Sequence, residues 1–132
     1  MATESVEAPG LIREVGEMRR WSDRRRRAGE RIALVPTMGY LHEGHLSLVD
    51  RARAASDQVV MSIFVNPAQF GPGEDLETYP RDLERDLRLA ADRGVDLVFA
   101  PPAPAMYPTA QTIWVDPGPV GARLCGASRP GH

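Results

Sequence analysis

The feature that most constrains the fold is an alternation of short apolar runs and helical patterns between residues 32 and 100. Apolar runs at residues 32–35, 59–65 and 96–100 predict buried strands. Apolar residues recur at helical spacing between these runs, which predicts helices over residues 45–55 and 81–92. This strand–helix–strand–helix–strand order predicts an α/β fold, a Rossmann-like parallel sheet with flanking helices.

The segments outside this alternation are less patterned. Residues 1–10 are small and polar, which predicts a disordered tip followed by a single domain over residues 11–132. A helix is predicted from residue 11 to about residue 26. The arginine run at residues 24–27 lies at its C-terminal end, where cations offset the helix dipole. After residue 100, frequent proline and glycine predict loops, with a short strand at 112–115 and a helical turn at 120–124.

Composition excludes several classes of function. The charge balance is 16 Lys+Arg against 18 Asp+Glu, a net charge of −2, so nucleic acid is not expected as a partner. The arginine run is the one possible exception, but it is short and has no flanking aromatic residues. All of the basic residues are arginine, so no lysine can form a Schiff base or bind phosphate.

The cysteine content and the absence of long apolar runs indicate a compartment. The single cysteine, Cys125, excludes an internal disulfide and fits a reducing cytoplasm. We expect its side chain to be buried or to lie in an interface. No apolar run approaches the roughly 20 residues that span a bilayer, and the start of the chain lacks a secretory signal, so we expect a cytoplasmic protein without membrane contact.

The segment after the first predicted strand carries the strongest candidate site. Ligands of parallel sheets bind at the carboxyl ends of the strands, and here that position holds His42 and His45 in the first turn of a helix. Residues three apart on a helix project from the same side, so both imidazoles can contact one phosphate, and Gly44 lets a ligand approach the backbone. The free N–H groups of the helix start add to this site, and Gly39 allows the turn before it. The alternatives are a zinc site, which lacks the usual i, i+4 spacing, and two surface histidines that cap a helix.

The motif His42-Glu43-Gly44-His45 resembles that of the nucleotidyltransferase superfamily. Within it, residues 35–45 (VPTMGYLHEGH) closely resemble the pantothenate synthetase (pantoate–β-alanine ligase) family. Further blocks carry the same resemblance in the same order: residues 62–70 (SIFVNPAQF), 74–76 (EDL), 79–81 (YPR), 95–101 (VDLVFAP), 106–108 (MYP) and 126–132 (GASRPGH). The resemblance covers residues 11–132.

The resemblance implies an ATP-dependent ligation in coenzyme A biosynthesis. Pantoate would attack the α-phosphate of ATP, and β-alanine would then attack the pantoyl adenylate and release AMP. His45 would be the proton donor, with His42 beside it on the phosphates. The wall of the ATP site would consist of Met38, Gly39, Tyr40, Leu41, His42, Glu43, Gly44 and His45. Pantoate would contact Gln69, Asn66, Pro36 and Met38.

The resemblance also implies Mg²⁺ with the ATP, and relatives form homodimers. Asp86 matches an acidic position near the metal and phosphates, although a solvated helix face would equally explain an aspartate there. The family continues well beyond residue 132 with a C-terminal lid domain, so we expect a truncated chain that makes no pantothenate at an appreciable rate. The alternative is a non-catalytic remnant or binding module that retains weak affinity for pantoate or ATP.

Overall fold

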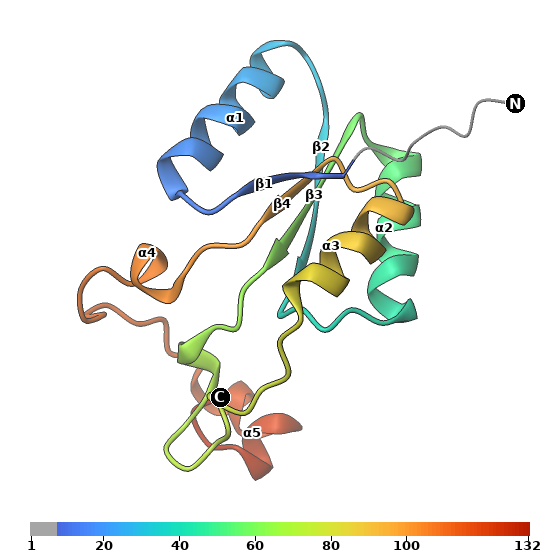
Figure 1. Cartoon of the computed structure of the whole chain (residues 1–132). Coiled ribbons are helices and arrows are strands. Elements are labelled where there is room, and N and C mark those ends of the chain that lie inside the picture. Colours follow the sequence, from blue (N-terminus) through green and yellow to red (C-terminus); the bar gives the residue numbers. More distant parts are fainter. Residues whose placement is uncertain (1–7) are drawn as a thin grey trace, which may run out of the picture.

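The computed structural model describes residues 8–132, and its centre is a parallel sheet of four strands (Figure 1). The strands lie side by side in the order β1-β4-β3-β2. Their bounds are β1 (Gly10–Ile12), β2 (Ile32–Thr37), β3 (Gln58–Ile63) and β4 (Leu97–Phe99). Each neighbouring pair is parallel, which confirms the predicted α/β fold.

Three longer helices flank the sheet. Helix α1 (Val15–Arg27) lies on one face, and α2 (Glu43–Ala55) and α3 (Leu83–Asp92) lie on the other (Figure 1). The remaining helical segments are one or two turns long: η1 (Pro67–Gln69), α4 (Ala103–Met106), η2 (Gly118–Ala122) and α5 (Cys125–Ser128). Among the described residues, no helix combines the length and apolar character needed to cross a membrane.

Strand β3 shows how the two faces of the sheet are filled, because successive side chains of a strand point to opposite faces. Val59 and Met61 are buried in one apolar cluster with Val49 of α2. Val60, between them, belongs to the cluster on the opposite face, where Met18 of α1 packs. The continuous apolar run in β3 therefore reflects burial on both faces.

The carboxyl ends of the strands meet at one edge of the sheet because all four strands run in the same direction. The loop after β2 leads into α2, and the long loop after β3 leads into α3. This edge is where parallel α/β sheets bind ligands.

The beginning of the chain differs from the sequence-based expectation. The predicted disordered tip falls largely outside the described residues, but Gly10 is ordered and begins β1. The predicted helix from residue 11 is wrong at its start, because Leu11 and Ile12 pair with β4 and the helix begins at Val15. A three-residue strand is too short to show a periodicity of its own.

Strand β2 also runs further than predicted, through Pro36 to Thr37. Within the described sheet β2 pairs only with β3, so it is an edge strand. Proline, which has no N–H to donate, is tolerated at an edge.

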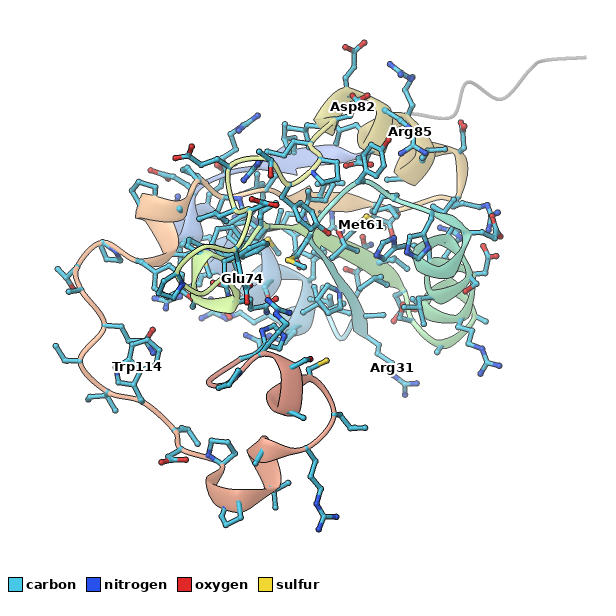
Figure 2. The ribbon with its side chains drawn as sticks, turned by 90° about the horizontal axis from the view of Figure 1, so that it is seen from below. Arg31, Met61, Glu74, Asp82, Arg85 and Trp114 are labelled. Carbon is cyan, nitrogen blue, oxygen red and sulfur yellow. The ribbon has the colours of Figure 1, made fainter. Side chains whose placement is uncertain are left out.

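The predicted strand at residues 112–115 is absent from the described structure. That segment is extended but unpaired, with Ile113 82% and Val115 95% exposed. Trp114, labelled in Figure 2, is 67% exposed and lines a shallow pocket with Ala68 and Tyr107. The predicted turn at 120–124 overlaps η2. Cys125, expected to be buried or to lie in an interface, is exposed in the single chain.

Candidate functional site

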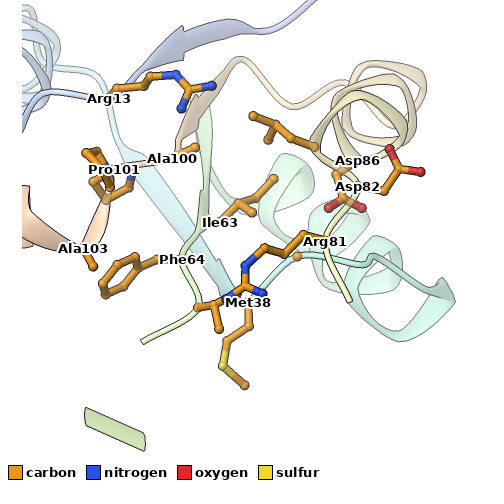
Figure 3. Close-up of a pocket in the computed structure, with 14 residues that line it drawn as sticks. Arg13, Met38, Ile63, Phe64, Arg81, Asp82, Asp86, Ala100, Pro101 and Ala103 are labelled. Atoms are coloured by element: carbon orange, nitrogen blue, oxygen red, sulfur yellow. The ribbon is translucent and has the colours of Figure 1, made fainter. Parts of the chain in front are cut away.

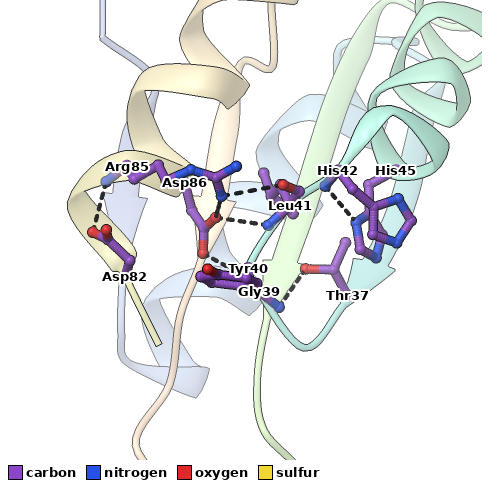
Figure 4. Close-up of polar contacts among 9 residues, drawn as sticks. All are labelled: Thr37, Gly39, Tyr40, Leu41, His42, His45, Asp82, Arg85 and Asp86. Carbon is purple, nitrogen blue, oxygen red and sulfur yellow. Dashed lines mark hydrogen bonds and ion pairs between the residues drawn. The ribbon is translucent and has the colours of Figure 1, made fainter. Parts of the chain in front are cut away.

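The two histidines of the first loop form the start of α2, and their rings lie against each other. The ring centroids of His42 and His45 are 4.0 Å apart, which confirms the prediction that both project from one side (Figure 4). Gly44 donates its N–H to Nδ1 of His42 at 3.0 Å, and His42 donates its own N–H to Nδ1 of His45 at 3.2 Å. The pair therefore caps the helix as a reciprocal capping box does.

These two hydrogen bonds determine where each neutral ring carries its proton. A backbone N–H can only donate, so both Nδ1 atoms must be unprotonated acceptors. Each neutral imidazole then holds its proton on Nε2 and can donate it to a ligand. The Gly44 N–H, expected to be free for an anion, is already bonded to a ring. The imidazoles thus replace part of the backbone as the donors at this helix end.

The charge state of His45 follows from its surroundings. Partial burial lowers the pKa of His45 below its usual value of 6.5, and the adjacent His42 lowers it further. The carboxylate of Asp86 raises the pKa of His45, but it is the weakest of the three influences. His45 is therefore neutral at pH 7, with an Nε2 proton that it can share with an anion.

The turn before α2 has an unusual backbone. Gly39 and Tyr40 both have positive φ, 79° and 52°. Gly39 is required for a second reason, because a Cβ atom there would lie 3.0 Å from Oδ2 of Asp86. Thr37 supports the turn by accepting the Gly39 N–H at 3.1 Å. The prediction that Gly39 permits this turn is confirmed.

Asp86 of α3 reaches the same turn. Its Oδ2 accepts the N–H of Tyr40 at 2.8 Å and its Oδ1 accepts the N–H of Leu41 at 2.9 Å (Figure 4). Asp86 is only 1% exposed, so the interpretation as a solvated helix face is wrong. A signal for this was present in the sequence, because Asp86 lies three residues after Leu83 and four before Ala90, on the apolar face of α3.

Glu43 points away from the histidines and toward α3. Its carboxylate binds Arg93 through two hydrogen bonds of 2.8 Å, and Arg93 also donates to Asp50 at 2.9 Å. The hydrogen bond with Glu43 raises the pKa of Arg93. Arg93 was not predicted as a site residue. It keeps the charge of Glu43 paired beside a site that would hold an anion.

The residues of the predicted ATP wall are contiguous in sequence, but they differ in how far they are exposed to a ligand. Leu41 is 1% exposed, so its side chain belongs to the core and only its backbone can face a ligand. Met38 and Gly39 line a pocket of about 280 Å³ at the carboxyl edge of the sheet, opposite Arg13 and Pro101 (Figure 3). The described lining of this pocket does not include the two histidines.

The predicted pantoate residues lie on two neighbouring strand ends. Pro36 is exposed near the end of β2. Asn66 caps η1, where its Oδ1 accepts the N–H of Ala68 at 3.0 Å and the hydroxyl of Tyr107 at 2.8 Å. Gln69 is exposed, and among the described residues no hydrogen-bond partner of its side chain is found. Its amide is therefore free to bind a ligand.

The C-terminal segment contacts the loop that carries Gln69. Arg129 donates to the Gln69 carbonyl at 2.8 Å and forms a two-pronged ion pair with Glu74, with Nε 3.0 Å from Oε1. Hydrogen bonding from Arg129 lowers the pKa of Glu74. His132 lies 3.1 Å from the same carbonyl, through Nδ1. We call these contacts the Arg129 latch.

Comparison with known proteins places this arrangement in context. Residues 10–132 match the family model described as pantoate-beta-alanine ligase. The pantothenate synthetase of Heliobacterium modesticaldum is 59% identical over 122 residues, covering 92% of this chain and 43% of the relative. That of Syntrophobacter fumaroxidans is 58% identical over 120 residues, covering 91% and 42%.

Solved structures agree with these sequences. A pantothenate synthetase from Thermus thermophilus superimposes with a TM-score of 0.78 at 50% identity, covering 93% of this chain and 43% of that one. A pantoate-beta-alanine ligase from Francisella tularensis, complexed with beta-gamma ATP and beta-alanine, has a TM-score of 0.82 at 36% identity, covering 95% and 48%. The chain thus spans less than half the length of the relatives it matches.

Proposed function

The chain belongs to the pantoate–β-alanine ligase family, and from this membership we propose that it is the nucleotide-binding part of an enzyme that joins pantoate to β-alanine with ATP. The observation that carries the proposal is the pair of adjacent imidazoles at the start of α2, each with Nε2 free to donate. The Francisella relative, crystallised with an ATP analogue and β-alanine, supports the same substrates.

The reaction proceeds in two displacements. A carboxylate oxygen of pantoate attacks the α-phosphorus of ATP, a new P–O bond forms, and the bond to pyrophosphate breaks. The amine of β-alanine then attacks the pantoyl carbonyl carbon, an amide bond forms, and AMP leaves. No covalent bond to the protein is needed, so the residues act by positioning reactants and stabilising charge.

His42 and His45 stabilise negative charge on the phosphate oxygens through their Nε2 protons. The loss of one such donor costs about 2.7–4 kcal/mol of barrier. The proton-donor role of His45 is then the donation of a hydrogen bond from its Nε2 proton to the phosphate oxygens, because the ring is neutral. The backbone of Met38, Gly39, Tyr40 and Leu41 completes this wall, together with the backbone of Glu43 and Gly44.

Pantoate lies between the ends of β2 and β3. The free amide of Gln69 and the Nδ2 group of Asn66 supply donors for its hydroxyl and carboxylate oxygens. Pro36 and Met38 form the apolar side of this subsite.

Magnesium enters with the nucleotide rather than as a resident ion. Among the described residues, no group of three His, Cys, Asp or Glu side chains is arranged to hold a metal. Asp86, the acidic candidate, already uses both oxygens as acceptors of backbone N–H groups. These residues do not fit a protein-bound Mg²⁺, and the phosphates of ATP are its ligands.

Residues 11–132 act as one nucleotide-binding domain that needs the remaining part of a family member for turnover. The test measures binding of a non-hydrolysable ATP analogue and pantoate by calorimetry, alongside pantoate-dependent AMP release. Both are measured for the chain alone and for a fusion to the segment that follows in the Heliobacterium relative. Binding without turnover by the chain alone, and turnover by the fusion, are the expected results.

A variant at the start of α2 and a control variant on the other face of the sheet test where the ATP analogue binds. His45→Ala should weaken binding of the ATP analogue by about tenfold or more, the value of one lost charge-assisted hydrogen bond. Arg27→Ala, at the exposed end of α1 on the other face, should leave binding unchanged. A folded wild-type chain that binds neither ligand would overturn the proposal, and AMP release by the chain alone would overturn its dependence on the remaining segment.

A further inference from the structure

We infer that Asp86 is a positioning residue that holds the phosphate-binding histidines in place from the neighbouring helix α3. The inference rests on the proposed function in one respect, namely that His42 and His45 bind phosphate. Nothing in that proposal gives Asp86 a part in the reaction. Asp86 is 1% exposed, and although it lines the pocket beside Met38 and Gly39, both of its carboxylate oxygens accept backbone N–H groups.

The first step of the argument is the backbone of the turn. Gly39 and Tyr40 adopt positive φ in succession, a conformation that costs energy for a residue with a side chain such as Tyr40. Successive N–H groups in such a turn point toward a common centre and form a concavity that binds anions. The carboxylate of Asp86 occupies that centre, with 2.8 Å to the N–H of Tyr40 and 2.9 Å to that of Leu41.

The second step is that α3 holds the other side of the same peptide segment. Arg85 donates from Nη1 to the carbonyl of Leu41 at 3.1 Å. The same guanidinium lies 3.7 Å from Oδ1 of Asp86 and 5.2 Å above the ring of Tyr40 (Figure 4). Both the N–H and the C=O of Leu41 are thus bonded to α3, and its side chain is anchored in the core.

The third step links this anchored residue to the rings. His42 follows Leu41 directly, and the N–H of His42 is the group that orients the ring of His45. The ring of His42 in turn accepts the N–H of Gly44. A shift of Leu41 would therefore move the His42 N–H and rotate both Nε2 donors away from their common target. Loss of the carboxylate should act on the histidines without any contact between Asp86 and the ligand.

The decisive variant is Asp86→Asn, which keeps the shape of the side chain. An amide oxygen can accept one of the two N–H groups, but the NH₂ group would then face the other N–H, donor against donor. We expect the ring proton resonances of His42 and His45 and the amide resonance of Leu41 to shift in NMR spectra. Affinity for the ATP analogue with Mg²⁺ should fall by about tenfold, the effect of one lost hydrogen bond to a charged group.

Asp82→Asn is the matched control, because Asp82 lies on the same helix and also accepts one backbone N–H, that of Arg85 at 3.1 Å. This variant removes a carboxylate charge but keeps a good N-cap residue at the start of α3, and it touches neither Tyr40 nor Leu41. Urea unfolding of both variants gives the stability loss, against which the binding loss is compared. Asp82→Asn should leave the ring resonances and the affinity unchanged.

Two outcomes overturn separate claims. If Asp86→Asn leaves the histidine resonances in place, or if both variants lose affinity in proportion to stability, Asp86 is only a structural residue. If the wild-type chain binds no ATP analogue, the proposed function fails, while the resonance shifts still decide whether Asp86 positions the rings.

Discussion

His42 and His45 each perform two tasks at the residue scale. Each Nδ1 accepts a backbone N–H at the start of α2, and each Nε2 faces outward. Substitutions can therefore separate the structural task from the binding task. Asparagine is among the best residues at a helix N-cap, but it places no donor where Nε2 stands.

We predict that His42→Asn retains the stability of the chain, whereas His42→Ala loses about 1 kcal/mol of unfolding free energy with the cap. Both variants should lose about tenfold in affinity for the ATP analogue, because both lack the Nε2 donor. Urea denaturation and calorimetry measure the two quantities. Equal affinity of His42→Asn and the wild type would show that the ring is only a cap.

The lowered pKa of His45 predicts a dependence of stability on pH. The unfolded chain, with the usual pKa of 6.5, binds the proton more readily than the folded chain. The free energy of unfolding should therefore decrease as the pH falls from above 6.5 through the lower pKa of the folded state. Urea unfolding at several pH values tests this, and His45→Asn should flatten the dependence in that range. A stability that increases on acidification there would contradict the assignment.

The residue scale also shows what the sequence could and could not predict. The histidine pair and Gly39 follow from local spacing, because three-residue separation on a helix is independent of the rest of the fold. Asp86 and Arg93 act across more than forty residues of sequence, and only the packing of α3 against the α2 side reveals their partners. Cys125 was expected to be buried or to lie in an interface, and the single chain leaves it exposed.

The Arg129 latch operates at the scale of elements, since it joins the C-terminal segment to the loop of η1. We predict that Arg129→Ala frees this loop, because the Gln69 carbonyl and the Glu74 carboxylate lose their partner. Hydrogen exchange and limited proteolysis should both increase over residues 69–78. Global stability should change little, as is usual for a solvent-accessible ion pair.

Arg123→Ala is the control, since Arg123 is exposed in the same segment and no ion-pair partner for it is found among the described residues. The exchange pair Glu74→Arg with Arg129→Glu should restore part of the protection. If Arg129→Ala leaves the loop as protected as in the wild type, the latch does not hold it.

The sequence predicted the bounds of an element well where its apolar pattern was long. The prediction failed where pairing with a strand distant in sequence determines whether the element forms. Helices α2 and α3 lie within two residues of the predicted ranges. Strand β1 exists only because β4 pairs with it, and the strand expected at residues 112–115 has suitable residues but no described partner. β-propensity describes a fit to a neighbouring strand, so without that neighbour it predicts little.

At the scale of the whole molecule, one face of the sheet is only partly covered. A groove of about 670 Å³ lies between α1 and the sheet, and Leu34 of the edge strand β2, 61% exposed, lines it. We predict that the chain alone binds the dye ANS and self-associates, because exposed apolar surface and an open strand edge both favour association.

Leu34→Arg should reduce this self-association without unfolding the chain, since the side chain is not part of the buried core. Analytical ultracentrifugation and circular dichroism measure the two effects. Thr112→Arg, in the exposed extended segment, is a control for added charge alone. A wild-type chain that stays monomeric at high concentration and does not increase ANS fluorescence would contradict the prediction.

The orientation of the two histidine rings has a consequence for ionic strength. An anion lying against α2 meets the N–H dipole of the neutral His45 ring where many phosphate loops present a lysine. Salt weakens attraction between full charges far more than it weakens short, directed dipole contacts. The affinity of an anion for the start of α2 should consequently vary little between dilute and concentrated electrolyte. Selection among anions then depends on the direction of their oxygen lone pairs.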